Sequence, residues 1–196
     1  MEYKTYTKQV WKGSVLTSPV PPTLVTCEAD GVKNIFTVAW TGVLCTQPPV
    51  TYISVRPERY SYDIISKSKE FVINLATKEL TKAVDLCGVR SGRKMDKFAH
   101  LGLTCEKANK VNVPILVQSP LNLECKVRQI VKLGTHDMFI ADIVAVDVAN
   151  ELVDDKGRLA LENAGLLAYS HGEYYELGKK LGSFGFSVKK KKKKSK

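Results

Sequence analysis

The sequence predicts a mainly β fold, a barrel of about six antiparallel strands with short helices inserted in its middle. Two observations predict it. Two β-rich runs within residues 23–40 flank Asp30-Gly31, the favoured chemistry of a tight hairpin turn. Two runs of about a dozen residues, from 121 and from 138, are joined through the segment GTHD. Long antiparallel strands must hide their edges, and closure into a barrel does so.

Residues 34–50, NIFTVAWTGVLCTQPPV, read as a buried strand in their first half and as a turn in their second. Asn34, Thr37, Trp40 and Thr41 are more polar than a strand buried on both faces requires. The stretch is therefore either a core strand or the wall of a ligand site.

The middle of the chain alternates between strand and helix. Residues 50–55 and 70–77 have strand character, and residues 59–69 have the apolar spacing of a helix. The segments KELTKAVDLCG and RKMDKFAHLG predict two short helices, each ended by a glycine, with a basic glycine loop between them.

A chain of 196 residues predicts one domain, residues 1–188, followed by a disordered lysine-rich tail, residues 189–196. The aromatic and glycine-rich residues 166–187 are expected to wrap back over the barrel. No apolar run approaches the ~18 residues of a membrane helix, so no membrane span is expected. The first residues lack the apolar core of a secretory signal, which favours a cytoplasmic location.

The tail explains most of the basic character of the chain. Lys189–Lys194 and Lys196 supply seven of the ten net positive charges. Such a run is expected either to solubilise the chain or to attract RNA or another anionic surface without sequence preference. A nucleic-acid-binding β-barrel is therefore an alternative, although the aromatic residues are not interleaved with Lys and Arg as base stacking requires.

Five cysteines without any CxxC spacing argue against a zinc knuckle and a disulfide framework. Most are expected to be small buried residues. Cys87 has Arg90, Arg93 and Lys94 close by in sequence, and nearby cations lower the pKa of a thiol. A redox-active Cys87 is thus an alternative to a buried one.

Several familiar chemistries are missing from the sequence. It contains no GxGxxG, GxxxxGK[ST], HExxH or GxSxG motif, which argues against dinucleotide folds, P-loops, zincins and α/β-hydrolases. No metal site, catalytic acid or nucleophile is expected. His136, beside Asp137 at a strand entry, is expected either to bind an anionic or carbonyl group or to hydrogen-bond its own turn.

The segment ISVRPERYSYD places hydroxyl and basic side chains at a strand end and at the start of a helix. Free N–H groups and the dipole at a helix N-terminus favour an anion, and Arg adds a two-pronged donor. A phosphate site is one interpretation, and ordinary surface arginines are the other.

Four ordered segments carry a resemblance to a known family: FTVAWTGVLCTQPPVTYISVRPERYSYDII, EFVINL, CGVRSGRKMDKF and GTHDMFIADIVAV. Over about residues 15 to 175 the chain resembles the flavin reductase-like FMN-binding split-barrel family, in particular its flavoredoxin branch. The resemblance implies a six-stranded split barrel of Greek-key type. It also implies a homodimer that holds FMN near the subunit interface.

The resemblance assigns a role to each candidate residue. The flavin-contacting strand, the phosphate and ribityl region, and a phosphate partner in the glycine loop correspond to Thr37, Val38, Ala39, Trp40, Ser54, Val55, Arg56, Tyr60, Ser61 and Lys94. His136 falls where two-component flavin reductases have a histidine near the nicotinamide.

The function implied is an FMN-dependent oxidoreductase that passes electrons from NADH, NADPH or a redox-protein partner through FMN to an acceptor. A flavin-binding electron carrier without pyridine-nucleotide activity is the alternative. The sequence does not choose between the two.

Overall fold

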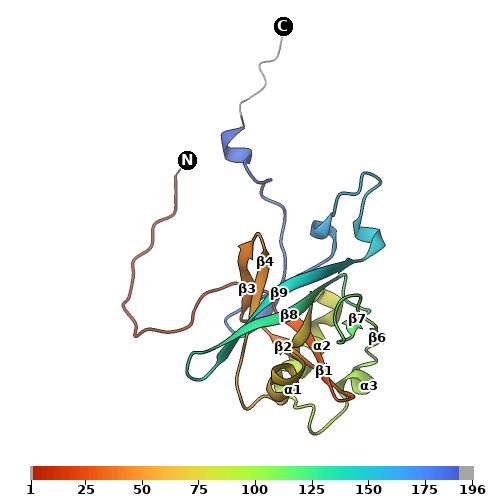
Figure 1. Cartoon of the computed structure of the whole chain (residues 1–196). Helices are drawn as coiled ribbons and strands as arrows, with labels where there is room; N and C mark the ends of the chain where they lie inside the picture. Colours follow the sequence, from red (N-terminus) through yellow and green to blue (C-terminus); the bar gives the residue numbers. More distant parts are fainter. Residues whose placement is uncertain (1, 190–196) are drawn as a thin grey trace.

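The computed structural model describes residues 2–189 and is built around one antiparallel sheet (Figure 1). The sheet has seven strands, in the order β2-β1-β5-β8-β9-β4-β3. Their bounds are β1 Thr23–Ala29, β2 Val32–Val38, β3 Thr41–Thr46, β4 Pro49–Val55, β5 Glu70–Asn74, β8 Leu121–Lys132 and β9 Asp137–Val148. Two small hairpins, β6 (Cys105–Glu106) with β7 (Ile115–Leu116) and β10 (Leu167–Ser170) with β11 (Glu173–Glu176), complete the β structure.

The mainly antiparallel β class is confirmed, but the main sheet has seven strands where six were expected. The difference lies in residues 34–50. Their second half is not a turn, because residues 41–46 form strand β3, which pairs with β4 and leaves only residues 47 and 48 for the turn.

The edge strands of this sheet, β2 and β3, are consecutive in the chain and are separated only by Ala39 and Trp40. So short a link holds the two ends of the sheet together, and the sheet is rolled. Among residues 2–189 no ladder of backbone hydrogen bonds joins β2 to β3. The roll is therefore split along this seam.

The helices are short, as the sequence predicts. They are α1 (Tyr60–Ser68), α2 (Thr81–Val89) and α3 (Lys97–Leu101), with single 3₁₀ turns at Lys78–Leu80, Asn150–Leu152, Leu161–Asn163 and Phe186–Val188. Gly102 ends α3 with a φ of +64°, which confirms that prediction. The same prediction for Gly88 is wrong, because α2 continues through Gly88 to Val89 and the Arg90 N–H donates to the Leu86 carbonyl.

The inner face of the roll forms the largest core cluster, with α1 covering one end. Phe71 and Phe139 are fully buried at its centre, and Tyr62 of α1 packs edge-on against Phe139. The alternation of strand side chains explains the arrangement, because every second residue of β1, β2 and β5 faces inward. The inward set is Val25, Cys27, Phe36, Val38, Phe71 and Ile73.

The outer face of β1 and β2 is covered by α2 and α3. Ile35 and Leu24 point outward and pack with Val84 and Cys87 of α2. One helix therefore rests directly behind the strand that the sequence analysis singled out.

Strands β8 and β9 each have twelve residues, as expected, and form the longest ladder of the sheet. Figure 1 shows this pair crossing the whole molecule. It connects the half of the sheet that contains β1 and β2 to the half that contains β3 and β4.

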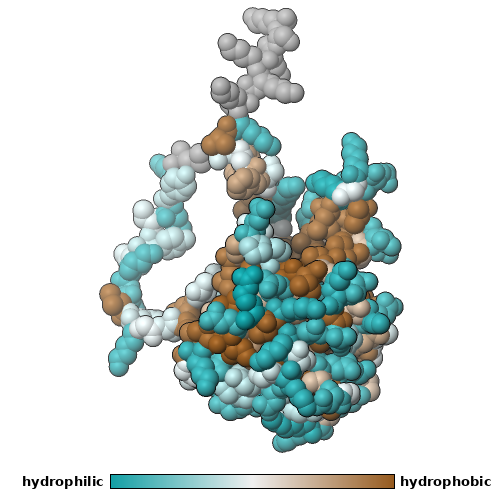
Figure 2. Space-filling model, in the orientation of Figure 1, coloured by the Kyte–Doolittle hydropathy of each residue, from teal (hydrophilic) through white to brown (hydrophobic). Residues whose placement is uncertain are grey.

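Residues 166–176 fold back onto the body, because Val20 and Tyr169 form a β-bridge and Thr77 bridges to Leu166. The expectation was wrong for residues 177–187, which leave the body as an exposed arm. Figure 2 shows this arm and the N-terminal arm, residues 2–17, standing away from the body. In the C-terminal arm Leu181 and Phe184 are fully exposed, whereas Val15 and Leu16, near the end of the N-terminal arm, line a depression with Trp40 and Tyr169.

The lysine tail lies outside the described residues except for Lys189, so its disorder and any nucleic-acid binding stay predictions. Within the described part of the chain, no helix is long and apolar enough to cross a membrane.

Asn74 of β5 ties together three separate parts of the fold. Its amide donates to the Leu24 carbonyl at 2.8 Å, and its side-chain oxygen accepts from the Leu116 N–H at 3.0 Å and from Asn122 at 2.7 Å. Because Asn74 is fully buried, removal of its side chain would leave each of these partners without a hydrogen bond and without water to replace it.

We expect Asn74→Ala to lower the free energy of unfolding by about 2–3 kcal/mol, since it leaves buried donors and acceptors unpaired. Urea denaturation followed by circular dichroism measures this change in the free energy of unfolding. The control is Asn112→Ala at an exposed position, expected to change stability by less than about 0.5 kcal/mol. Equal stability of the two variants would contradict the role of Asn74.

Candidate functional site

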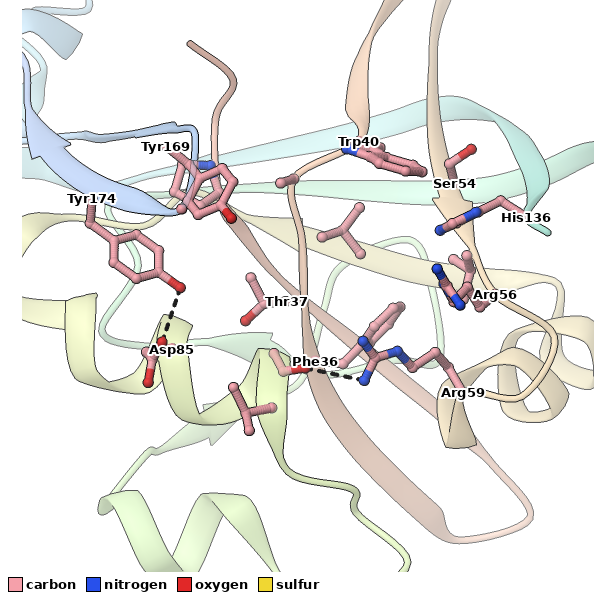
Figure 3. A pocket seen from close by; sticks show the side chains of 17 residues that line it. Phe36, Thr37, Trp40, Ser54, Arg56, Arg59, Asp85, His136, Tyr169 and Tyr174 are labelled. Atoms are coloured by element: carbon pink, nitrogen blue, oxygen red, sulfur yellow. Dashed lines mark hydrogen bonds between the residues drawn. The ribbon is translucent and has the colours of Figure 1, made fainter. Parts of the chain in front are cut away.

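A cavity of about 390 Å³ opens where β2, β4 and α2 meet (Figure 3). The turn between β8 and β9 and the β10–β11 hairpin close it on two further sides. We call it the main cavity. Its walls are Pro22, Phe36, Thr37, Val38, Ala39, Trp40, Ser54, Val55, Arg56, Arg59, Asp85, Gly88, Val89, His136, Tyr169, Gly172 and Tyr174.

One wall of the main cavity is the end of β2 and the short link to β3. The Thr37 hydroxyl donates to the Val84 carbonyl of α2, which ties the strand to the helix behind it. The Trp40 carbonyl accepts a hydrogen bond from the Ser54 N–H at 2.9 Å. Because the Thr37 hydroxyl is already bonded to the helix, residues 37–39 can offer a ligand chiefly their backbone groups.

A second wall combines an aromatic ring with an imidazole. The rings of Trp40 and His136 lie 4.4 Å apart between centroids, tilted by 43°. Burial lowers the pKa of His136, and the positive charges of Arg56 and Arg59 lower it further. At neutral pH the imidazole is therefore held in its uncharged form, able to donate and to accept one hydrogen bond.

On the opposite side, Tyr169 and Tyr174 face the cavity from the β10–β11 hairpin, with ring centroids 5.4 Å apart (Figure 3). The Tyr174 hydroxyl donates to the Asp85 carboxylate of α2 at 3.3 Å. Burial, together with the Asp85 charge, raises the pKa of Tyr174 to about 12, so the phenol stays protonated. This contact fastens the hairpin to α2.

A smaller hollow of about 120 Å³ adjoins the main cavity and shares Phe36 and Arg59 with it. We call it the basic hollow. The start of α1, the end of α2 and the loop after α2 form it, and its walls are Asn34, Phe36, Glu58, Arg59, Tyr60, Ser61, Cys87, Arg90, Ser91, Gly92 and Lys97.

Lys97 is the unusual member of the basic hollow, because its residue is only 2% exposed. Its ammonium donates to the carbonyls of Arg90 at 3.3 Å and Cys87 at 3.5 Å. Within residues 2–189 it forms no ion pair with a carboxylate. Burial lowers its pKa, as expected for a cation removed from water without a compensating anion.

Gly92 brings the loop after α2 against the floor of the basic hollow. A Cβ at this position would lie 2.2 Å from the Asn34 side-chain oxygen and 3.0 Å from the Tyr60 ring. The Asn34 amide in turn donates to the Ser61 hydroxyl at 2.7 Å, and both residues are buried. Only glycine allows this approach.

The structure brings most of the candidate residues together. Eight of the eleven line the main cavity: Thr37, Val38, Ala39, Trp40, Ser54, Val55, Arg56 and His136. Tyr60 and Ser61 line the basic hollow. Lys94 lines neither, because its side chain belongs to a separate depression between α2 and α3.

Sequence reasoning missed Asn34, Lys97, Asp85, Tyr169 and Tyr174 as site residues. Asp85 and Lys97 are charged residues in short helices, where a side chain of this kind ordinarily faces solvent. The two tyrosines belong to a segment that was expected to wrap over the fold but carried no motif. Only Asn34 gave a signal, as a polar residue inside a buried strand.

Cys87 is buried, and burial raises the pKa of its thiol to about 11. The buried alternative for Cys87 is therefore confirmed, and the other alternative, a pKa lowered by Arg90, Arg93 and Lys94, is wrong. Those side chains are exposed, and the cation that acts on the thiol is Lys97, whose effect is smaller than that of burial. Cys27 and Cys125 are buried as well, as expected.

The chain matches the model of the flavin reductase like domain over residues 15–178. The chain belongs to the flavin reductase-like family. The match includes the main cavity and the basic hollow completely, and it confirms the resemblance seen in the sequence.

Several known proteins resemble the chain in fold or in sequence. Flavoredoxin of Desulfovibrio vulgaris (Miyazaki F) superposes with a TM-score of 0.86 at 29% identity, over 93% of this chain and all of that one. A protein of Archaeoglobus fulgidus is 33% identical over 123 residues, 63% of this chain and 70% of that protein. An NADH-dependent FMN reductase, RutF of Pseudomonas syringae, is 27% identical over 123 residues, 63% of this chain and 67% of that protein.

We expect Arg56→Gln to raise the pKa of His136, because one of the positive charges that disfavour the imidazolium is removed. Deprotonation of the His136 ring to its uncharged form then requires a higher pH. A proton NMR titration of the imidazole measures this. The control is Arg158→Gln, which removes the same charge from a turn outside the cavity and should leave His136 unchanged. The same His136 pKa in both variants would contradict the effect of the Arg56 charge on the imidazole.

Proposed function

We propose that the chain is an FMN-binding oxidoreductase that passes electrons from a reduced pyridine nucleotide or a redox protein to an acceptor. One observation carries the proposal: a basic hollow with a buried, unpaired lysine adjoins a larger cavity with aromatic walls. FMN has the same two parts, a phosphate at one end of a flexible chain and a planar ring at the other.

The basic hollow fits the phosphate. The Lys97 ammonium would gain the anion that its burial requires, and the Ser61 hydroxyl can donate once Asn34 holds it in place. The hollow also lies at the start of α1, where backbone N–H groups and the helix dipole favour negative charge. Arg59, between the two spaces, would contact the phosphate or the ribityl chain.

The main cavity fits the ring. Residues 37–40 at the end of β2 form one wall, and Trp40 and Tyr169 provide flat apolar surface at its sides. The volume, about 390 Å³, lies within the range of roughly 300–1,000 Å³ typical of small-molecule sites.

Bound FMN would supply the hydride and single-electron chemistry, and the protein groups would hold and orient it. Arg56 would place a positive charge beside the ring. His136 is uncharged near neutral pH, so it can hydrogen-bond the amide of a nicotinamide without repelling the donor's positive product. Neither residue needs to act as nucleophile.

The chain's relatives support two versions of this activity. Similarity to an FMN reductase that uses NADH favours pyridine-nucleotide oxidation, whereas similarity to flavoredoxin favours electron transfer to and from other redox partners. We favour the reductase version, because His136 and Trp40 lie together in the wall of the main cavity and Trp40 is 42% exposed, so a nicotinamide could reach both.

We also propose a homodimer with FMN near the subunit interface. The edge strand β3 starts beside the main cavity and exposes apolar side chains, with Val43 73% and Leu44 48% exposed. Trp40, at the cavity itself, is 42% exposed. A second copy covering this edge would bury all three. A monomeric mass in light scattering would contradict the proposal.

We expect Lys97→Met to weaken FMN binding about 10- to 100-fold, since a hydrogen bond to a charged group contributes about 1.5–3 kcal/mol. Riboflavin has no phosphate and should bind the variant and the parent protein within about threefold of each other, an energy difference of under about 1 kcal/mol. Fluorescence quenching of the flavin measures both affinities. An equal loss for the two ligands would place Lys97 elsewhere than at the phosphate.

The donor is tested by anaerobic titration of the FMN-loaded protein with NADH and with NADPH. The reductase version predicts that a stoichiometric amount of one of them bleaches the visible band of oxidised flavin. In a steady-state assay with free flavin as the acceptor, His136→Ala is expected to raise KM for that donor. Failure of both to reduce the flavin, while dithionite does, would leave the carrier version.

A further inference from the structure

Asp137, the first residue of β9, is a buried carboxylate that directly follows His136 in the chain. Its residue is 4% exposed, and within residues 2–189 it forms no ion pair with Lys or Arg. The Tyr62 hydroxyl of α1 donates to its Oδ2 at 2.6 Å, and no other side chain in the described part of the protein donates to it. A buried carboxylate requires a donor, and Tyr62 supplies it.

Tyr62 is itself held in place by the core. Its ring packs edge-on against the fully buried Phe139, with centroids 5.2 Å apart, and its N–H donates to the Arg59 carbonyl at 2.9 Å. The hydrogen bond to Asp137 raises the pKa of Tyr62, so the hydroxyl remains protonated and donating throughout the neutral range.

The turn that precedes β9 carries His136 and is otherwise exposed. The Leu133 N–H donates to the His136 carbonyl at 3.1 Å, and the Thr135 hydroxyl hydrogen-bonds the imidazole Nδ1 at 3.0 Å. Both bonds lie within the turn, so they fix its shape but not its place on the body. Neighbouring residues of an extended chain face opposite sides, and Asp137 faces α1 whereas His136 faces the main cavity (Figure 3).

Asp137 is also the point where the ladders of β9 to both β4 and β8 begin. The end of a ladder opens more easily than its middle. The hydrogen bond from Tyr62 closes this end, one residue away from the imidazole.

We propose that Tyr62 is a positioning residue for His136, because its hydrogen bond to Asp137 fixes the start of β9 and with it the imidazole in the wall of the main cavity. The inference rests on the proposed function, in which His136 binds the nicotinamide. Tyr62 lines neither the main cavity nor the basic hollow, so it acts only through Asp137.

The same turn of α1 also reaches the basic hollow. Arg59, Tyr60 and Ser61 directly precede Tyr62 and line that hollow. The place proposed for the flavin phosphate and the residue proposed for the electron donor are therefore both held by the first turn of one helix.

The first experiment is a proton NMR titration of the full chain without flavin. Tyr62→Phe removes the hydroxyl and keeps the ring against Phe139. We expect the pKa of His136 to rise toward its ordinary value as burial of the imidazole is relieved, and its ring-proton shifts to change as it moves relative to Trp40.

The matched control is Tyr52→Phe. Tyr52 is half-buried on β4, lines none of the cavities named here, and its hydroxyl forms no hydrogen bond within residues 2–189. The titration of His136 in this variant should match that of the parent protein.

The second experiment is steady-state kinetics of the FMN-loaded chain. We expect Tyr62→Phe to raise KM for the donor about two- to tenfold, the effect of losing one hydrogen bond, with kcat and FMN affinity within about threefold of the parent values. The double variant Tyr62→Phe/His136→Ala should have the KM of His136→Ala alone, because the two residues act as a unit. Asp137→Asn should keep KM within about threefold of the parent value, since an amide still hydrogen-bonds the phenol.

Three outcomes would overturn the proposal. They are an unchanged His136 titration in Tyr62→Phe, a further rise of KM in the double variant, and a KM in Asp137→Asn as high as in His136→Ala. A structural role of Tyr62 alone would add its effect to that of His136. Failure of the parent protein to bind FMN would refute the proposed function, and the NMR comparison would still decide whether Tyr62 positions the imidazole.

Discussion

The fold depends on one covalent constraint, the two-residue link between the edge strands of the sheet. β2 and β3 stand at opposite ends of a seven-stranded order, yet only Ala39 and Trp40 separate them in the chain. Three Cα–Cα steps span at most about 11 Å. A flat sheet of seven strands would hold its edges roughly 29 Å apart, since neighbouring strands lie about 4.8 Å from each other. The sheet must therefore curl enough to bring the end of β2 close to the start of β3, and the main cavity and the basic hollow lie beside β2.

Rolling gives β2 an inside and an outside, and this accounts for its polar residues. Phe36 and Val38 enter the inner core, whereas Ile35 and Thr37 turn outward to α2. Thr37 bonds a helix carbonyl, and Asn34 bonds Ser61. The polarity of the strand thus serves to join it to two helices. What remains free for a ligand is the backbone at its end, where pairing with a neighbouring strand stops.

The sequence was sufficient for features that are continuous along the chain. The twelve-residue strands, the Gly102 helix end and the residues that line the cavity from 37–40 and 54–56 all follow from local pattern or from resemblance. It was not sufficient for Lys97. Asp96 caps the helix by accepting from the Phe98 and Ala99 N–H groups, and a lysine just after such a cap ordinarily points to solvent. Lys97 instead turns toward the end of α2, where its ammonium donates to the Cys87 and Arg90 carbonyls, a contact that only the tertiary structure reveals.

The buried lysine also links binding to stability. An ammonium removed from water and bonded only to two carbonyls costs stability in the absence of an anion, and a bound phosphate would reverse much of that cost. A ligand that binds the folded state alone stabilises it further by mass action. In the adjoining main cavity His136 is uncharged and Arg56 is a fixed cation, whereas the basic hollow has Arg59, Arg90 and Lys97, so more of the positive charge lies where a phosphate would bind. Under the proposed function, this uneven charge would orient the ligand with its phosphate in the basic hollow and its ring in the main cavity.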